Sequence, residues 1–145
     1  MLDKVNTERF YLNQPQLPEL PIPHDCMIKS ALIENNCLVF NFEDDISGYD
    51  SIRCYKPEAK SLIIRYHLAY DKADIRIFKR QAAHGLFRRR ESYKTLEFRE
   101  FSKLTERMEY LTHYLAYCSL IIELCAYDNI LLRADVDHIE YEWIL

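Results

Sequence analysis

Glycine is scarce in this sequence, which holds two glycines, Gly48 and Gly85, in 145 residues. Loops that bind phosphate groups need glycine, because a residue without a side chain lets backbone N–H groups approach the ligand closely. The chain contains no G-x-x-x-x-G-K-S/T, no G-x-G-x-x-G and no G-x-S-x-G pattern. These absences exclude phosphate-loop enzymes of the familiar kinds, and they imply that Asn, Asp and Pro make the turns.

The sequence also lacks any run of about 18 apolar residues, which is the length that a membrane-spanning helix needs. The first residues, Met1 to Asn6, show no basic-then-apolar export signal. Five cysteines occur without a C-x-x-C pair, and we expect reduced, buried thiols rather than a disulfide or zinc framework. The sequence therefore predicts a cytoplasmic protein with no membrane segment and no cofactor.

Length and composition favour a single domain over residues 1–145, because 49% of the residues are hydrophobic and can fill one core. Residues 1–24 form a proline-rich arm that we expect to be extended, since proline fixes φ and donates no hydrogen bond. The arm either lies along its own domain, which we favour, or binds a proline-recognising partner. Its prolines are Pro15, Pro18, Pro21 and Pro23.

Alternation of apolar and polar residues predicts two β-hairpins. The first joins Met27–Glu34 to Cys37–Glu43 through Asn35-Asn36, because Asn tolerates the positive φ of a two-residue turn. The predicted facing pairs are Ile33 with Leu38, Ala31 with Phe40 and Lys29 with Phe42, and Cys37 falls on the opposite, outward face.

The second predicted hairpin joins residues 61–70 to residues 73–79 through Asp71-Lys72, and it places His67 opposite Arg76 on its outward face. The predicted inward residues of its first strand include Leu62, Ile64, Tyr66 and Leu68. A short strand follows at residues 92–98, and another turn is expected at Asp128-Asn129.

An apolar spacing of 3-4-3-4-3 begins at Phe101 and predicts one long amphipathic helix. We end the helix near Tyr117, although the same spacing continues to Cys125 and strand-forming residues begin at Leu120. The fold class expected from these elements is α+β, a mostly antiparallel sheet built from hairpins with the helix packed on one face. The repeating residues are Phe101, Leu104, Met108, Leu111, Leu115 and Cys118.

The acidic tail holds the densest group of metal-ligand residue types. Its apolar positions change from even to odd numbers near Asp137-His138, so a bulge or turn is predicted there. On a strand, every second residue shares a face at a spacing of about 6.5–7 Å, which is long for one ion. The alternatives are therefore a metal site, in a metal-dependent enzyme, and a solvated strand face. The candidate ligands are Asp135, Asp137, His138, Glu140 and Glu142.

A basic segment at residues 76–99 carries eight Lys and Arg against two Glu, within a chain of net charge −4. Basic residues neutralise phosphates and neighbouring aromatic rings can stack on bases, so the segment is a candidate nucleic-acid site. A solvated loop or a protein-docking patch explains the same charges. The candidate residues are Lys79, Arg80, Arg88, Arg89 and Arg90.

His24 and Asp25 form a further candidate beside Cys26. Adjacent strand residues point to opposite faces, so their side chains cannot converge unless the backbone turns there. The simpler interpretation is that they bond local backbone at a turn.

The order Pro23-His24-Asp25-Cys26, strand, Asn35-Asn36, strand, with a later acidic strand from Ile139 to Trp143, resembles small bacterial β-rich proteins of unassigned function. Some of those resemble immunity proteins that bind and block a toxin. The resemblance implies a noncatalytic protein that binds a protein partner.

No nucleophile–base–orienter set can be assembled from the sequence. We therefore expect a cytoplasmic, noncatalytic protein-binding module, either immunity-like or a homodimer, rather than an enzyme. The alternatives are nucleic-acid binding through residues 76–99 and a metal-dependent enzyme that uses the acidic tail.

Overall fold

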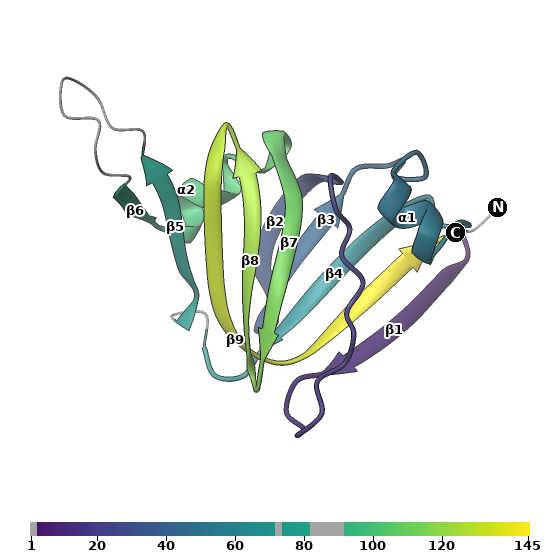
Figure 1. The fold of residues 1–145 in the computed structure, drawn as a ribbon, viewed down its shortest axis with the longest axis horizontal. Helices are drawn as coiled ribbons and strands as arrows, with labels where there is room; N and C mark the ends of the chain where they lie inside the picture. The colour runs from purple at the N-terminus through teal and green to yellow at the C-terminus, as the bar shows by residue number, and fades with distance from the viewer. Residues whose placement is uncertain (1–2, 72–73, 82–91) are drawn as a thin grey trace.

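The computed structural model describes residues 3–71, 74–81 and 92–145. Strands account for 55% of the structure, and they form one antiparallel sheet of nine strands (Figure 1). The strands are β1 (Val5–Tyr11), β2 (Met27–Glu34), β3 (Cys37–Phe42), β4 (Ser61–Leu68), β5 (Arg76–Gln81), β6 (Ser92–Leu96), β7 (Met108–Ala116), β8 (Ser119–Ala126) and β9 (Asp128–Ile144). The helical segments are α1 (Asp50–Tyr55), α2 (Phe98–Ser102) and the 3-10 turn η2 (Thr105–Arg107).

The long strand β9 organises the sheet (Figure 1). The strand order is β4-β3-β2-β7-β8-β9-β5-β6, and β4 also pairs with β9, so the first six strands close on themselves. The first half of β9 pairs with β8 and β5, and its second half pairs with β4 and β1. β9 therefore pairs with strands in both halves of the sheet. A change of direction within β9 determines how these two halves are oriented.

The inner face of the sheet holds the core, in which buried tyrosines keep hydrogen-bond partners. The Tyr66 and Tyr110 hydroxyls are 3.4 Å apart, and the Tyr110 hydroxyl is 2.6 Å from Nδ1 of His113. Burial raises the pKa of both tyrosines, so their hydroxyls stay protonated and can donate. The Tyr141 hydroxyl donates to the backbone carbonyl of Pro21 at 2.6 Å.

The proline-rich segment that follows β1 crosses this inner face (Figure 1). Leu12 and Leu20 are buried in the core, and the Leu12 N–H donates to the Asp137 carbonyl at 2.8 Å. His113 Nε2 lies 3.2 Å from the Leu20 carbonyl, so the segment also satisfies a buried imidazole. The described part of residues 1–24 therefore packs on its own domain, partly as strand β1 and partly as an extended strap.

The predicted first hairpin is confirmed as β2 and β3. Asn35 and Asn36 have φ of 51° and 57°, the left-handed values that a two-residue turn requires. Ile33 pairs with Leu38 and Ala31 with Phe40, as expected. The register shifts between Ile28 and Ser30, so Phe42 pairs with Ile28 rather than with Lys29, and Lys29 stays exposed instead of facing the core.

The predicted second hairpin is wrong. The inward residues Leu62, Ile64, Tyr66 and Leu68 are buried as expected, but β4 pairs with β3 and β9, while β5 pairs with β9 and β6. The alternation of apolar and polar residues shows which face of a strand is buried, but it does not show which strand pairs with it. Here the paired strands are distant in sequence. Lys72 and Ala73, at the predicted turn, lie outside the described residues.

The predicted long helix, and with it the α+β class, is also wrong. Residues 108–116 and 119–126 form β7 and β8, and the α-helices in the described ranges have six residues or fewer. A bulge between Tyr110 and Thr112 moves the buried positions of β7 from Met108 and Tyr110 to His113. The bulge lets Met108 before it and Leu115 after it both pack on the core, and their seven-residue spacing equals about two helical turns, which explains the error.

The bulge predicted near Asp137-His138 is confirmed, because His67 pairs with His138 while Leu68 pairs with Val136. The bulge lets β9 bury Val136 before it and Ile139 after it without burying charge. The turn before β9 centres on Tyr127, with φ of 68°, one residue earlier than the predicted Asp128-Asn129. Among the described residues, no helix has the length and apolarity needed to span a membrane.

Candidate functional site

Chemically capable side chains gather on the outer face of β3, β4, β9 and β1, which we call the polar face. Strand pairing aligns Cys37 with His67, His67 with His138, and His138 with Tyr11 in one row across the four strands. The next row aligns Val39, Arg65, Glu140 and Arg9. The polar face comprises Arg9, Tyr11, Cys37, Arg65, His67, His138, Glu140 and Glu142.

His67 connects a thiol to a carboxylate at the centre of this face. Its Nδ1 lies 3.2 Å from Sγ of Cys37, and its Nε2 is hydrogen-bonded to Glu140. An ionised carboxylate only accepts, so Nε2 carries the proton and Nδ1 is left as an acceptor for the Cys37 S–H. The Asn35 carbonyl, 3.6 Å from the same sulfur, is the longer alternative acceptor. Arg9 Nε lies 3.5 Å from the other oxygen of Glu140 and holds that carboxylate in place.

His138 stacks on His67 from the neighbouring strand. The two ring centroids are 3.9 Å apart and the ring planes are inclined by 14°, with Tyr11 stacked on the far side of His138 at 5.4 Å. Burial, together with the neighbouring His67, lowers the pKa of His138. His138 therefore adds a second imidazole beside the thiol–imidazole–carboxylate chain.

A hollow of about 390 Å³ opens beside the thiol. Cys37 itself is 6% exposed, and burial raises the pKa of its thiol, with Glu140 acting in the same direction and Arg65 against it. The thiol is therefore protonated at neutral pH, and ionising it needs a base. The hollow is lined by Glu34, Asn35, Cys37, Val39, Arg65 and His67.

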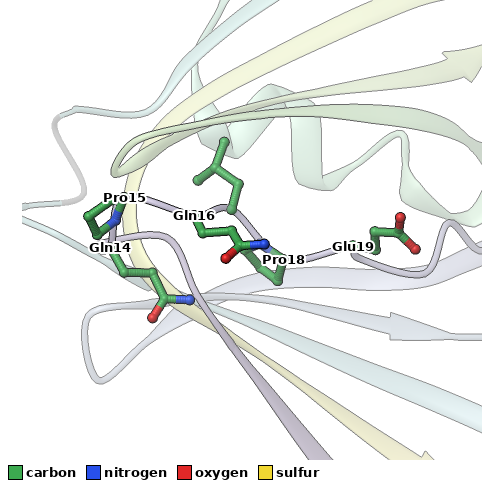
Figure 2. Close-up of a pocket in the computed structure, with 6 residues that line it drawn as sticks. Gln14, Pro15, Gln16, Pro18 and Glu19 are labelled. Atoms are coloured by element: carbon green, nitrogen blue, oxygen red, sulfur yellow. The ribbon is translucent and has the colours of Figure 1, made fainter.

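A larger hollow of about 660 Å³ lies in the loop after β1 (Figure 2). One continuous stretch, residues 14–19, lines it, and Glu19 is the ionisable residue in that stretch. Figure 2 shows the Gln14 and Glu19 side chains well apart along the loop. Since no second element contributes a side chain, this hollow offers little to orient a ligand, and we place the candidate site on the polar face instead.

The structure divides the predicted acidic metal cluster. His138 and Glu140 join the polar face, and their ligand atoms and those of His67 all lie within 4.8 Å of one another. Glu142 shares this face but lies 3.4 Å from Arg65. Asp135 lies 4.0 Å from Arg133, and the Asp137 carbonyl accepts the Leu12 N–H at the bulge. Neither Asp135 nor Asp137 contributes a ligand atom to the three-residue group.

The other predicted site residues lie elsewhere. His24 Nδ1 is 2.7 Å from the Leu111 carbonyl, and its Nε2 is 3.3 Å from Oδ1 of Asp25. Asp25 has φ of 68°, so a turn of the backbone brings these two exposed side chains together, apart from the polar face. Lys79 and Arg80 lie on β5 opposite Lys94 and Tyr93. The predicted Arg88, Arg89 and Arg90 lie outside the described residues, and the nucleic-acid site stays a prediction.

Sequence reasoning missed Cys37 and His67 as site residues. Their alternation did place both on the outward faces of their strands, which is where the structure has them. Joining them required the pairings of β3 with β4 and of β4 with β9, and the sequence predicted neither. Comparison with family models, curated proteins and solved structures finds no match to this chain.

Proposed function

We propose that the polar face is a thiol-dependent catalytic centre in which Cys37 is the nucleophile, His67 the general base and Glu140 the group that orients the base. The observation that carries the proposal is the 3.2 Å approach of Cys37 Sγ to His67 Nδ1, with His67 Nε2 bonded to Glu140. A nucleophile within hydrogen-bond reach of a base that a third group orients is the general arrangement of nucleophilic catalysis.

The chemistry that fits is acyl transfer from a small ester or thioester that enters the hollow. The Cys37 proton passes to Nδ1 of His67 as Sγ bonds to the carbonyl carbon, and Glu140 stabilises the imidazolium. The leaving group departs with the proton from His67, and an acyl thioester remains on Cys37. Water then attacks that thioester with His67 as base, which releases the acid and restores the thiol.

Arg65 gives the hollow a preference for acyl groups with a negative charge. Arg65 is one of the residues that line the hollow, and its Nη1 lies 3.4 Å from Glu142. A carboxylate on the substrate can accept from the N–H groups that Glu142 leaves free.

Free cysteines support this proposal. All five cysteines of the chain, which lie in the described ranges, are free of disulfides. We place the protein in the cytoplasm, because reducing conditions keep the Cys37 sulfur as a thiol.

Alkylation by iodoacetamide, followed by mass spectrometry of peptides from the native protein, tests the proposal. We expect His67→Gln to slow labelling of Cys37 about 100-fold, because the general base is lost, and Glu140→Gln to slow it less. Cys54 is exposed and serves as the internal reference whose labelling rate stays constant. The proposal also predicts a burst of one p-nitrophenol per chain from p-nitrophenyl acetate, which Cys37→Ser abolishes.

Equal Cys37 labelling in the wild type and His67→Gln would show that the imidazole does not activate the thiol. Thermal melting of each variant separates this outcome from unfolding, which would expose Cys37 and accelerate its labelling.

A second candidate function is protein binding, as the sequence suggested. It is favoured by three tyrosines at strand ends, Tyr70, Tyr117 and Tyr127, whose exposed fractions are 74%, 66% and 80%. Exposed tyrosines are common in protein interfaces because the ring buries area and the hydroxyl still bonds. For the homodimer alternative, light scattering should give a dimer mass that Tyr117→Ser reduces. A monomer at every concentration would leave that alternative without support.

A further inference from the structure

We infer that His67, His138 and Glu140 form a binding site for a transition-metal ion of the Zn²⁺ class. The metal site is inferred from the geometry of these side chains alone. Only the effect of the metal on Cys37 rests on the proposed function. Two imidazoles and one carboxylate suit zinc and its neighbours, whereas Mg²⁺ and Ca²⁺ prefer ligand sets made of oxygen atoms.

The strands place the three ligands before any ion arrives. His67 and His138 are directly paired residues of β4 and β9, and Glu140 is the next outward residue of β9. Their ligand atoms lie within 4.8 Å of one another, whereas bonds of about 2.0–2.2 Å in a tetrahedral site bring ligand atoms to about 3.5 Å. A contraction of about 1 Å completes the site, and side-chain rotation supplies it without backbone movement.

The required rotation follows from the stacking of the imidazoles. Two rings 3.9 Å apart and inclined by 14° cannot both direct a nitrogen lone pair at one ion, so His138 must tilt toward Glu140. The side chains of His67 and Glu140 are 28% and 18% exposed, so the ion enters from solvent and water completes its coordination. Arg9 competes for Glu140, but its side chain is 59% exposed and can swing away.

Metal binding reverses the hydrogen bond between His67 and Cys37. With an ion on Nε2, the imidazole proton moves to Nδ1, which then donates to the Cys37 sulfur instead of accepting from it. His67 can no longer take a proton from the thiol. The ion would therefore stop the proposed chemistry while Cys37 remains in contact with its base.

Calorimetric titration of the metal-free full chain with ZnCl₂ tests the site. A Cys54→Ser background removes the exposed thiol as a competing ligand. We expect one ion per chain and at least a 10-fold weaker affinity in His138→Gln, which loses one ligand but keeps the Cys37–His67–Glu140 chain. The matched control Asp135→Asn changes an acid of the same strand outside the three-residue group, and it should bind as the parent does.

Visible absorption bands of bound Co²⁺ give a second readout that does not depend on activity. Absence of both heat and Co²⁺ bands, or equal affinities of His138→Gln and Asp135→Asn, would overturn the metal site. Cys37 alkylation with and without Zn²⁺ then separates the two proposals. If Cys37 is alkylated rapidly but the chain does not bind Zn²⁺, the metal site is wrong and the proposed function is unaffected. If the chain binds Zn²⁺ but Cys37 is inert, the proposed function is wrong and the metal site is unaffected.

Discussion

At the scale of one residue, the buried His113 makes the stability of the protein depend on pH. It is 8% exposed, and burial lowers its pKa from 6.5 to about 4. The Leu20 carbonyl accepts from Nε2 and the Tyr110 hydroxyl donates to Nδ1, so the neutral ring is satisfied. The unfolded chain, with the ordinary pKa, takes up the proton first as the pH falls.

We therefore predict that the free energy of unfolding falls between pH 7 and pH 5 through His113. The contribution is full above pH 6.5 and is lost as the pH approaches 4, because the folded pKa lies below the unfolded one. Between pH 7 and pH 5 the expected loss is about 2 kcal/mol. Urea unfolding followed by fluorescence of Trp143 measures it, and His113→Gln should show a loss smaller by about that amount. An unchanged loss in His113→Gln would refute the prediction.

The β7–β8 hairpin shows the consequence of glycine scarcity at the scale of an element. Cys118 is the second residue of its two-residue turn and has φ of 51°, a conformation that costs a residue with a side chain about 1–2 kcal/mol. Its N–H donates to the Leu12 carbonyl, and its own carbonyl accepts the Val136 N–H, both at 3.0 Å. These bonds involve backbone atoms alone, so glycine can keep them.

We expect Cys118→Gly to stabilise the protein by about 1 kcal/mol, because glycine removes the steric cost while both backbone bonds stay. Cys118→Ala is the control, since alanine keeps the cost, and equal stabilities of the two variants in urea unfolding would contradict the argument. Tyr127, with φ of 68°, should gain less from glycine, because its hydroxyl accepts a 2.6 Å bond from Arg107.

The same elements show what sequence reasoning can reach. The β2–β3 hairpin was predictable because its turn, its alternation and its register all lie within 16 consecutive residues, from Met27 to Phe42. The strand β7 was not, because the bulge between Tyr110 and Thr112 breaks the alternation and leaves a spacing typical of a helix. A bulge is visible in a sequence when both flanking runs alternate clearly, as they do around Asp137.

At the scale of the whole molecule, the candidate site depends on pairings between distant strands. Cys37 and His67 are 30 residues apart, and His67 and Glu140 are 73 apart. The sequence indicated that His138 and Glu140 share a face, and it placed Cys37 and His67 on outward faces. The sequence could not show that these four residues lie together, because alternation carries no information on which strands are neighbours.

The position of β9 in the chain also has a consequence during synthesis. All four of its partner strands, β1, β4, β5 and β8, leave the ribosome before it does. At about 5–20 residues per second, β1 waits roughly 6–25 s for its partner with an unpaired edge open to other chains. His138 and Glu140 arrive with this last strand. The nascent Cys37 and His67 are therefore held apart from their carboxylate until the sheet closes, so the proposed centre is assembled only when folding is complete.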